Sequence, residues 1–161
     1  MPAFRTKRRV QHSAADMFEL VADMERYPEF VPLCERLRVR KRESGEGKTV
    51  VISDMTVAYK LLRETFSTRV TLDRAKLEIL VEYLDGPFRK LENKWSFHAE
   101  GERACLVEFF IAYEFRTKIL GFVMGAVFDA AFRKFAEAFE RRADEVYGRI
   151  RLVPRPAPGR R

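Results

Sequence analysis

Few side chains in this sequence of 161 residues could carry catalysis. Its two histidines, His12 and His98, show no clear nucleophile or carboxylate partner in the sequence. The two cysteines, Cys34 and Cys105, lack the spacing of a metal or redox motif and lie among apolar residues, which predicts reduced, buried thiols. Phosphate-binding glycine loops and clusters of metal ligands are also missing from the pattern. The sequence therefore predicts no catalytic residue, no metal site and no cofactor.

The unusual feature of the composition is fourteen phenylalanines. If a strongly curved sheet wraps around a helix, large flat side chains line the space between them better than they fill it. We therefore predict a cavity of several hundred Å³ for an apolar ligand, the usual size of such sites, with a filled core as the alternative. The residues predicted to line it are Met55, Val57, Tyr59, Asn93, Trp95, Phe97, Phe109, Tyr113, Met124, Phe128 and Phe132.

Three of these side chains, Tyr59, Asn93 and Tyr113, would be the polar groups of the cavity. Asn93 in particular must find a hydrogen-bond partner, because an unpaired buried amide costs about 1–3 kcal/mol. A short segment bounded by two prolines, residues 27–33, presents Tyr27, Phe30 and Val31 together. We predict that these three residues form the entrance to the cavity.

Hydrophobic periodicity predicts the elements that would position these residues. Residues 3–11 alternate as a strand, and Ser13 is placed to cap a helix that ends near residue 23. Between residues 36 and 116 the period is two, with turn signals that separate six strands. A helical stripe then runs from 119 to 147. The pattern predicts an α+β domain over residues 1–148, with a seven-stranded curved antiparallel sheet wrapped around one long C-terminal helix.

The positive charge is concentrated in few places. The net charge is +7, and the segment Arg149–Arg161 holds five arginines and no acid, which leaves +2 on residues 1–148. This tail is predicted to be disordered. Two further basic clusters lie in the first two strands: Arg5, Lys7, Arg8 and Arg9, and Arg36, Arg38, Arg40, Lys41 and Arg42. They are either solvated strand faces or contacts for RNA phosphates or anionic lipid headgroups.

The longest apolar stretch, residues 119–132, has 14 residues, whereas a membrane span needs about 20. The N-terminus shows no basic segment followed by an apolar core, so no secretory signal is predicted. These features predict a cytoplasmic protein, with peripheral contact to the inner membrane left open.

Two segments carry a family resemblance. Residues 12–23, HSAADMFELVAD, followed by YPEFVPLC at 27–34, resemble the opening of the coenzyme Q-binding protein family. These are START-like proteins related to the polyketide cyclase and dehydrase group. DGPFRKL at 85–91, followed by WSF at 95–97, is similar to a second signature of the same family. The resemblance covers about residues 2–148.

The resemblance implies a helix-grip fold with a hydrophobic tunnel. Ubiquinone is the ligand that it implies, in support of respiratory electron transfer, and it supplies no catalytic residue. The absence of a transit peptide fits a bacterial member. A bacterial branch of the family is a ribosome-association toxin that binds the large subunit and hinders subunit joining, and the sequence does not separate the two roles. A third alternative, a polyketide cyclase or aromatase, would need Tyr59, Tyr113 and Asp54 to face the cavity.

Overall fold

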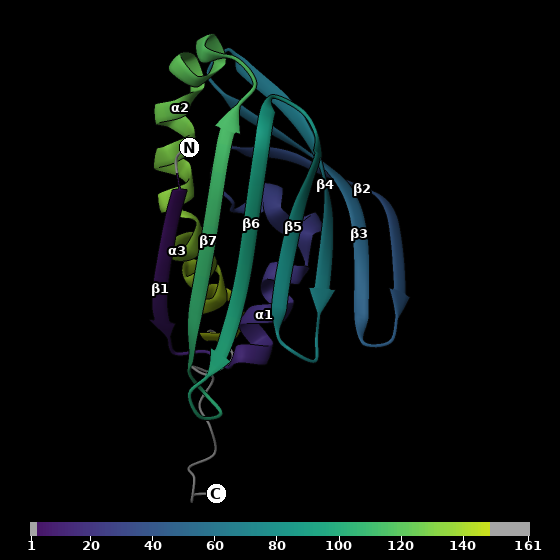
Figure 1. Cartoon of the computed structure of the whole chain (residues 1–161). Helices are drawn as coiled ribbons and strands as arrows, with labels where there is room; N and C mark the ends of the chain where they lie inside the picture. Colours follow the sequence, from purple (N-terminus) through teal and green to yellow (C-terminus); the bar gives the residue numbers. More distant parts are fainter. Residues whose placement is uncertain (1–2, 149–161) are drawn as a thin grey trace, which may run out of the picture.

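Seven strands form one antiparallel sheet in the computed structural model, which describes residues 3–148 (Figure 1). The sheet order is β1-β7-β6-β5-β4-β3-β2, so β2 to β7 form a meander and β1 pairs with β7. This confirms the predicted sheet and leaves β1 and β2 at opposite edges. The strands are β1 (Ala3–Val10), β2 (Cys34–Gly45), β3 (Lys48–Tyr59), β4 (Leu62–Asp73), β5 (Glu78–Asp85), β6 (Phe88–Ala99) and β7 (Cys105–Phe115).

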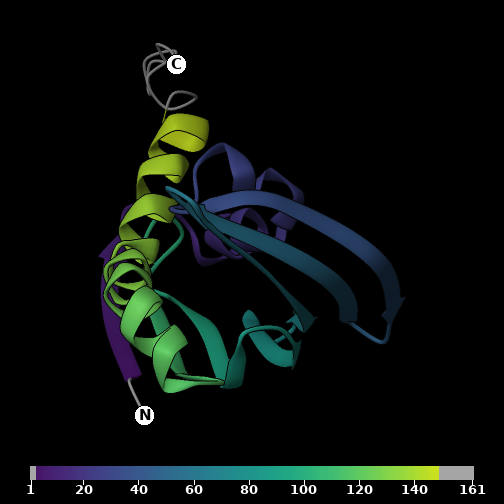
Figure 2. The same cartoon turned by 90° about the horizontal axis from the view of Figure 1, so that it is seen from above.

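The sheet is strongly curved, and the helices lie on its concave side (Figure 2). They are α1 (Ala14–Ala22), a 3₁₀ turn (Met24–Glu29), α2 (Lys118–Arg133) and α3 (Phe135–Ala143), which continues into a last turn (Asp144–Gly148). Register shifts occur in the β2–β3, β4–β5 and β6–β7 pairs, with the extra residue on β2, β5 and β6. Such bulges bend a strand and increase its twist, and here they help the sheet to close toward the helices, as the helix-grip fold requires.

The C-terminal helical segment is interrupted, whereas the sequence predicts one continuous helix over 119–147. The break is at Lys134, whose backbone N–H donates to Ala131 three residues back. An i→i−3 bond tightens the chain locally, and no proline or glycine is involved. The predicted cap of the first helix is confirmed, because Ser13 Oγ accepts from the Asp16 N–H at 3.0 Å.

Most aromatic rings pack against one another rather than against a void. The ring of Phe88 lies with its centroid 4.9–6.0 Å from five others, those of Phe66, Tyr83, Tyr113, Phe115 and Phe128. Gly86 precedes this cluster with φ +144°, and a Cβ there would lie 2.9 Å from the Phe66 Cα. The prediction that the phenylalanine excess marks a cavity wall is therefore wrong for much of the set, which forms the core.

Both cysteines are free and buried, as predicted. Burial disfavours the thiolate and raises the pKa of Cys34 and of Cys105 from 9.0 to about 11. We expect both thiols to react slowly with 5,5′-dithiobis(2-nitrobenzoate) at pH 8 and fast only after denaturation. Release of thionitrobenzoate, followed at 412 nm with and without guanidinium, checks this. Rapid labelling of two thiols in the native protein would contradict it.

Within residues 3–148, no helix is long and apolar enough to cross a membrane. The basic tail, Arg149–Arg161, lies outside the described residues, so its predicted disorder stays a prediction.

Candidate ligand-binding cavity

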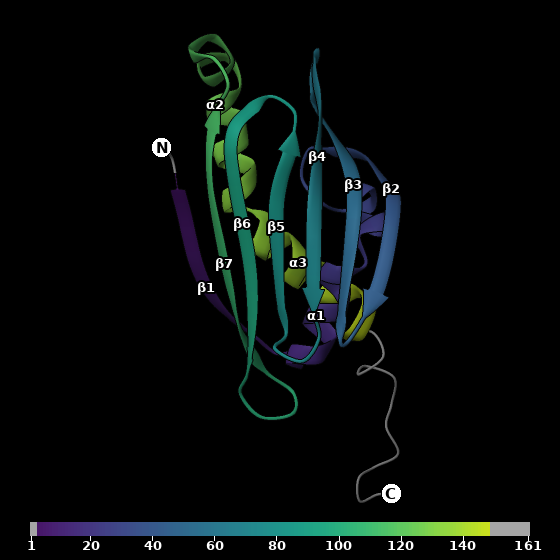
Figure 3. The same ribbon diagram turned by 45° about the vertical axis from the view of Figure 1, so that its right-hand side comes forward.

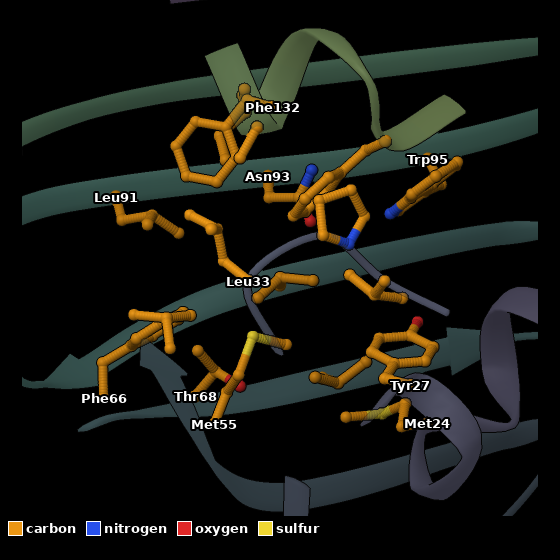
Figure 4. Close-up of a pocket in the computed structure, with 18 of the residues that line it drawn as sticks. Met24, Tyr27, Leu33, Met55, Phe66, Thr68, Leu91, Asn93, Trp95 and Phe132 are labelled. Atoms are coloured by element: carbon orange, nitrogen blue, oxygen red, sulfur yellow. The ribbon is translucent and has the colours of Figure 1, made fainter. Parts of the chain in front are cut away.

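One cavity lies between the sheet, the α2–α3 segment and the 3₁₀ turn (Figure 4). Its volume is about 80 Å³, which is well below the predicted several hundred and reflects the extent to which the aromatic rings fill the interior. The wall is almost wholly apolar. It draws on five strands and three helical segments: Met24, Tyr27, Val31, Pro32, Leu33, Ser53, Met55, Val57, Phe66, Thr68, Val70, Ile79, Val81, Leu91, Asn93, Trp95, Ile111, Phe128, Ala131, Phe132, Phe135 and Phe139.

Six of the eleven residues predicted to bind the ligand lie on this wall. They come from β3, β6 and α2, three elements distant in sequence that the curved sheet brings together (Figure 3). The six are Met55, Val57, Asn93, Trp95, Phe128 and Phe132.

The other five predicted residues do not line this cavity. Tyr59 ends β3 and is 41% exposed, with the Lys60 ammonium over its ring. Met124 lines a separate small pocket next to Tyr59. The remaining three lie on the inward side of their strands and pack against neighbouring rings: Phe97 against Phe18 and Trp95, Phe109 against Trp95 and Phe135, and Tyr113 against Phe88 and Phe132.

The predicted entrance residues occupy different places. Tyr27 and Val31 form part of the cavity wall. The Tyr27 hydroxyl donates to the Val21 carbonyl, and burial raises its pKa above the ordinary value. Phe30 instead packs on Phe139 and borders a polar groove on the other side of the turn.

Besides the Tyr27 hydroxyl and the Trp95 indole N–H, the polar groups of the cavity wall are Asn93, Ser53 and Thr68. Asn93 Nδ2 donates to the Phe110 carbonyl at 2.8 Å, which supplies the partner that a buried amide needs. Sequence reasoning missed Ser53 and Thr68, although each lies at an inward-facing position of its strand. Ser53 falls between the inward Val51 and Met55, and this alternation was the signal that could have identified it.

The acid–base groups that a cyclase would need are not in the cavity. Asp54 faces the outer side of the sheet, where Ser67 donates to it at 2.6 Å and Arg40 pairs with it at 3.1 Å. Tyr59 is at the hairpin tip, and burial, with Asp129 nearby, raises the pKa of Tyr113. A phenol with a raised pKa stays protonated at neutral pH and is a poor base.

A sequence model of the family described as polyketide cyclase / dehydrase and lipid transport matches residues 10–140. The chain belongs to this family. The START-like, helix-grip fold expected from the resemblance is confirmed, and so is the relation to coenzyme Q-binding and ribosome-association proteins.

This chain also matches individual members of the family over most of their length. "Ribosome association toxin RatA" of Escherichia coli K12 is 35% identical over 147 residues, which cover 91% of this chain and 90% of that protein. "Coenzyme Q-binding protein coq10, mitochondrial" of Schizosaccharomyces pombe is 25% identical and covers 89% and 87%. The solved 18 kDa protein CC1736 of Caulobacter crescentus has 34% identity and a TM-score of 0.74, with 92% and 99% covered.

The two basic strand clusters do not form one surface, because β1 and β2 are opposite edges of the sheet. On β1, Arg8 pairs with Glu140 and Arg9 with Glu100. On β2, Arg36 and Arg38 are exposed and form no ion pair among the described residues. The β2 edge therefore keeps the stronger uncompensated positive charge.

Proposed function

We propose that this chain is a non-enzymatic binder of a hydrophobic small molecule, ubiquinone or a related isoprenoid quinone, and that it supports quinone function in respiratory electron transport. The observation that carries the proposal is the apolar cavity between sheet and helix with three polar side chains in its wall. The family description, which includes lipid transport, and a relative named for coenzyme Q binding support it.

A quinone needs more room than about 80 Å³, so the wall must move when it binds. Met24 and Met55 line the cavity, and the flexible thioether side chain of methionine rearranges at low cost. Leu33, in the segment that covers the cavity, has φ +67°, a conformation that is rare for leucine. Movement of this segment would relieve that strain and enlarge the space.

Trp95, the single tryptophan of the chain, lies in the cavity wall and reports on occupancy. We expect short-chain ubiquinone-2 to quench its fluorescence saturably, whereas farnesol, which lacks the ring, should not. The complementary test is organic-solvent extraction of the purified protein with mass spectrometry. Absence of co-purified quinone together with absence of saturable quenching would refute the proposal.

Peripheral contact with a bilayer is part of the proposal, and the end of the molecule that carries the start of α2 supports it (Figures 1 and 3). Leu61, Ile119 and Phe122 there are 100%, 76% and 89% exposed. Lys60 adjoins Leu61 in the β3–β4 turn, and Lys118 adjoins Ile119 at the start of α2. These five residues, here called the apolar tip, belong to two segments at one end of the molecule, and their apolar and basic side chains suit an anionic lipid surface. The small pocket beside Tyr59 and Met124 shares Leu33, Val57 and Phe128 with the wall of the cavity.

Replacing Leu61 and Phe122 by serine is expected to weaken binding to vesicles of phosphatidylglycerol by about tenfold or more, because each buried apolar side chain contributes about 1.5–3 kcal/mol. Co-sedimentation measures this. Leu80→Ser is the matched control, since Leu80 is exposed on β5 away from the tip. Equal binding of all three proteins, or no binding of the wild type, would exclude the apolar tip as a membrane contact.

A second candidate is ribosome association, with binding to the large subunit that hinders subunit joining. Relatives named as ribosome association toxins, 31–37% identical, favour it, and the exposed Arg36 and Arg38 of β2 offer a surface for phosphates. Added protein should then lower the 70S peak in sucrose gradients at low salt. The Arg36→Glu/Arg38→Glu variant should leave the 70S peak unchanged. In a separate binding measurement, the slope of log affinity for ribosomes against log salt concentration should fall by about 2. An unchanged 70S peak with the wild type would remove this candidate.

The basic tail enters only as a further expectation of this candidate. Deletion of Arg149–Arg161 should weaken any RNA binding and flatten its salt dependence, because it removes five positive charges.

A further inference from the structure

Three polar side chains lie in the wall of an otherwise apolar cavity. Ser53 of β3 and Thr68 of β4 are directly paired across the two strands and are 1% and 6% exposed. Asn93 of β6 lies across the cavity from Thr68 (Figure 4). A ring held between the two walls would have one edge at the hydroxyl pair and the opposite edge at the amide.

The Asn93 amide has a fixed orientation. A backbone carbonyl accepts and cannot donate, so the atom that faces the Phe110 oxygen at 2.8 Å must be the nitrogen. The remaining amide atom, Oδ1, is turned toward the cavity (Figure 4). Because Oδ1 can only accept, it requires a ligand group that donates a hydrogen bond.

The hydroxyls of Ser53 and Thr68 lie in the cavity wall on neighbouring strands. Each can donate or accept. The pair is therefore poised to bind a polar atom of a ligand, whether that atom is a carbonyl oxygen or a hydroxyl.

We propose that Ser53, Thr68 and Asn93 form a polar subsite for an aromatic ring with a hydroxyl at each end, and that the cavity prefers a quinol to the corresponding quinone. This inference rests on the proposed function and names the form of the ligand. A quinol donates one hydroxyl to Asn93 Oδ1 and places the other at the hydroxyl pair. A quinone presents only hydrogen-bond acceptors, so one of its carbonyl oxygens would face Asn93 Oδ1. Neither of these two oxygens could then replace the hydrogen bonds that it makes with water.

Anaerobic calorimetric titration with ubiquinol-1 and with ubiquinone-1 tests the subsite. We expect the quinol to bind at least about fivefold more tightly, and Asn93→Leu to remove this difference. Because that variant removes the amide that donates to the Phe110 carbonyl, its fold is checked by circular dichroism. The isosteric variant Thr68→Val should fold normally, so it keeps the proposal testable if Asn93→Leu does not fold. Its affinity for both the quinol and the quinone should be about fivefold lower. Thr71→Val, the same change on the other face of β4, is the control.

The outcomes separate the subsite from the proposed function. Equal affinity of the two forms, with no effect of Thr68→Val, would mean that the polar groups hold only water, which overturns the subsite and leaves quinone binding intact. If neither form binds the wild-type protein, the proposed function fails and the subsite fails with it. Preference for the quinol that persists in Asn93→Leu would also overturn the assignment of Oδ1.

Discussion

Replacing Ala131 with leucine is expected to weaken ligand binding strongly without unfolding the protein. Ala131 projects from α2 into the cavity and is 7% exposed. The three additional carbon atoms of leucine fit into the space of about 80 Å³. They would then occupy the space that the ligand needs. Overpacking of a bound ligand against leucine should lower affinity by about 100-fold. The melting temperature should be unchanged or higher, because filling a cavity stabilises a core.

Titration of Trp95 fluorescence with ubiquinone-2, together with a thermal melt, measures both effects. Ala130→Leu is the matched control, because the same substitution one residue earlier faces solvent. The variant also separates the two candidate functions, since any effect on 70S ribosomes should persist in Ala131→Leu. Wild-type affinity in a folded Ala131→Leu protein would mean that ligands bind elsewhere.

The largest loss of stability is expected for Phe88→Ala. Phe88 is 1% exposed and lies at the centre of the six-ring cluster beneath α2, where its ring contacts five others. Truncation of a fully buried phenylalanine leaves a cavity and costs about 3–5 kcal/mol, a large part of the 5–15 kcal/mol that is typical of a domain. The substitution removes contacts between the sheet and α2 together, so neither element can restore them alone.

Guanidinium denaturation followed by circular dichroism measures the free energy of unfolding. Phe122→Ala provides the comparison, because that ring is 89% exposed and its loss should change stability by less than about 0.5 kcal/mol. A loss below about 1 kcal/mol for Phe88→Ala would show that the ring cluster does not hold α2 to the sheet.

The sheet was predictable because one face of each strand is apolar and short turns separate the strands. Alternation over β4, for example, places Phe66 and Val70 inward and Arg69 outward, and the structure agrees. The break at Lys134 was not predictable, since residues on both sides continue the helical stripe. It follows from how the segment meets a curved sheet, which is a tertiary property.

The membership of the cavity wall was only partly predictable for a related reason. Alternation tells which side of a strand a residue faces, but the neighbours that cover it come from other elements. Phe109 is inward, as predicted, yet the cavity wall next to it is formed by Trp95 and Phe135, whose rings pack against it. Conversely, Ser53 and Thr68 were passed over because they are polar, although their positions are inward. The volume depends on how rings interdigitate and is not encoded in any local pattern.

We propose that the space between the curved sheet and α2 binds an apolar ligand. Organic-solvent extraction and mass spectrometry of protein purified from quinone-containing cells tests it most directly. We expect an isoprenoid quinone in extracts of the wild type and of Ala130→Leu, and none in extracts of Ala131→Leu. Equal amounts of quinone in all three extracts, or no quinone in the wild type combined with a flat ubiquinone-2 titration, would contradict it.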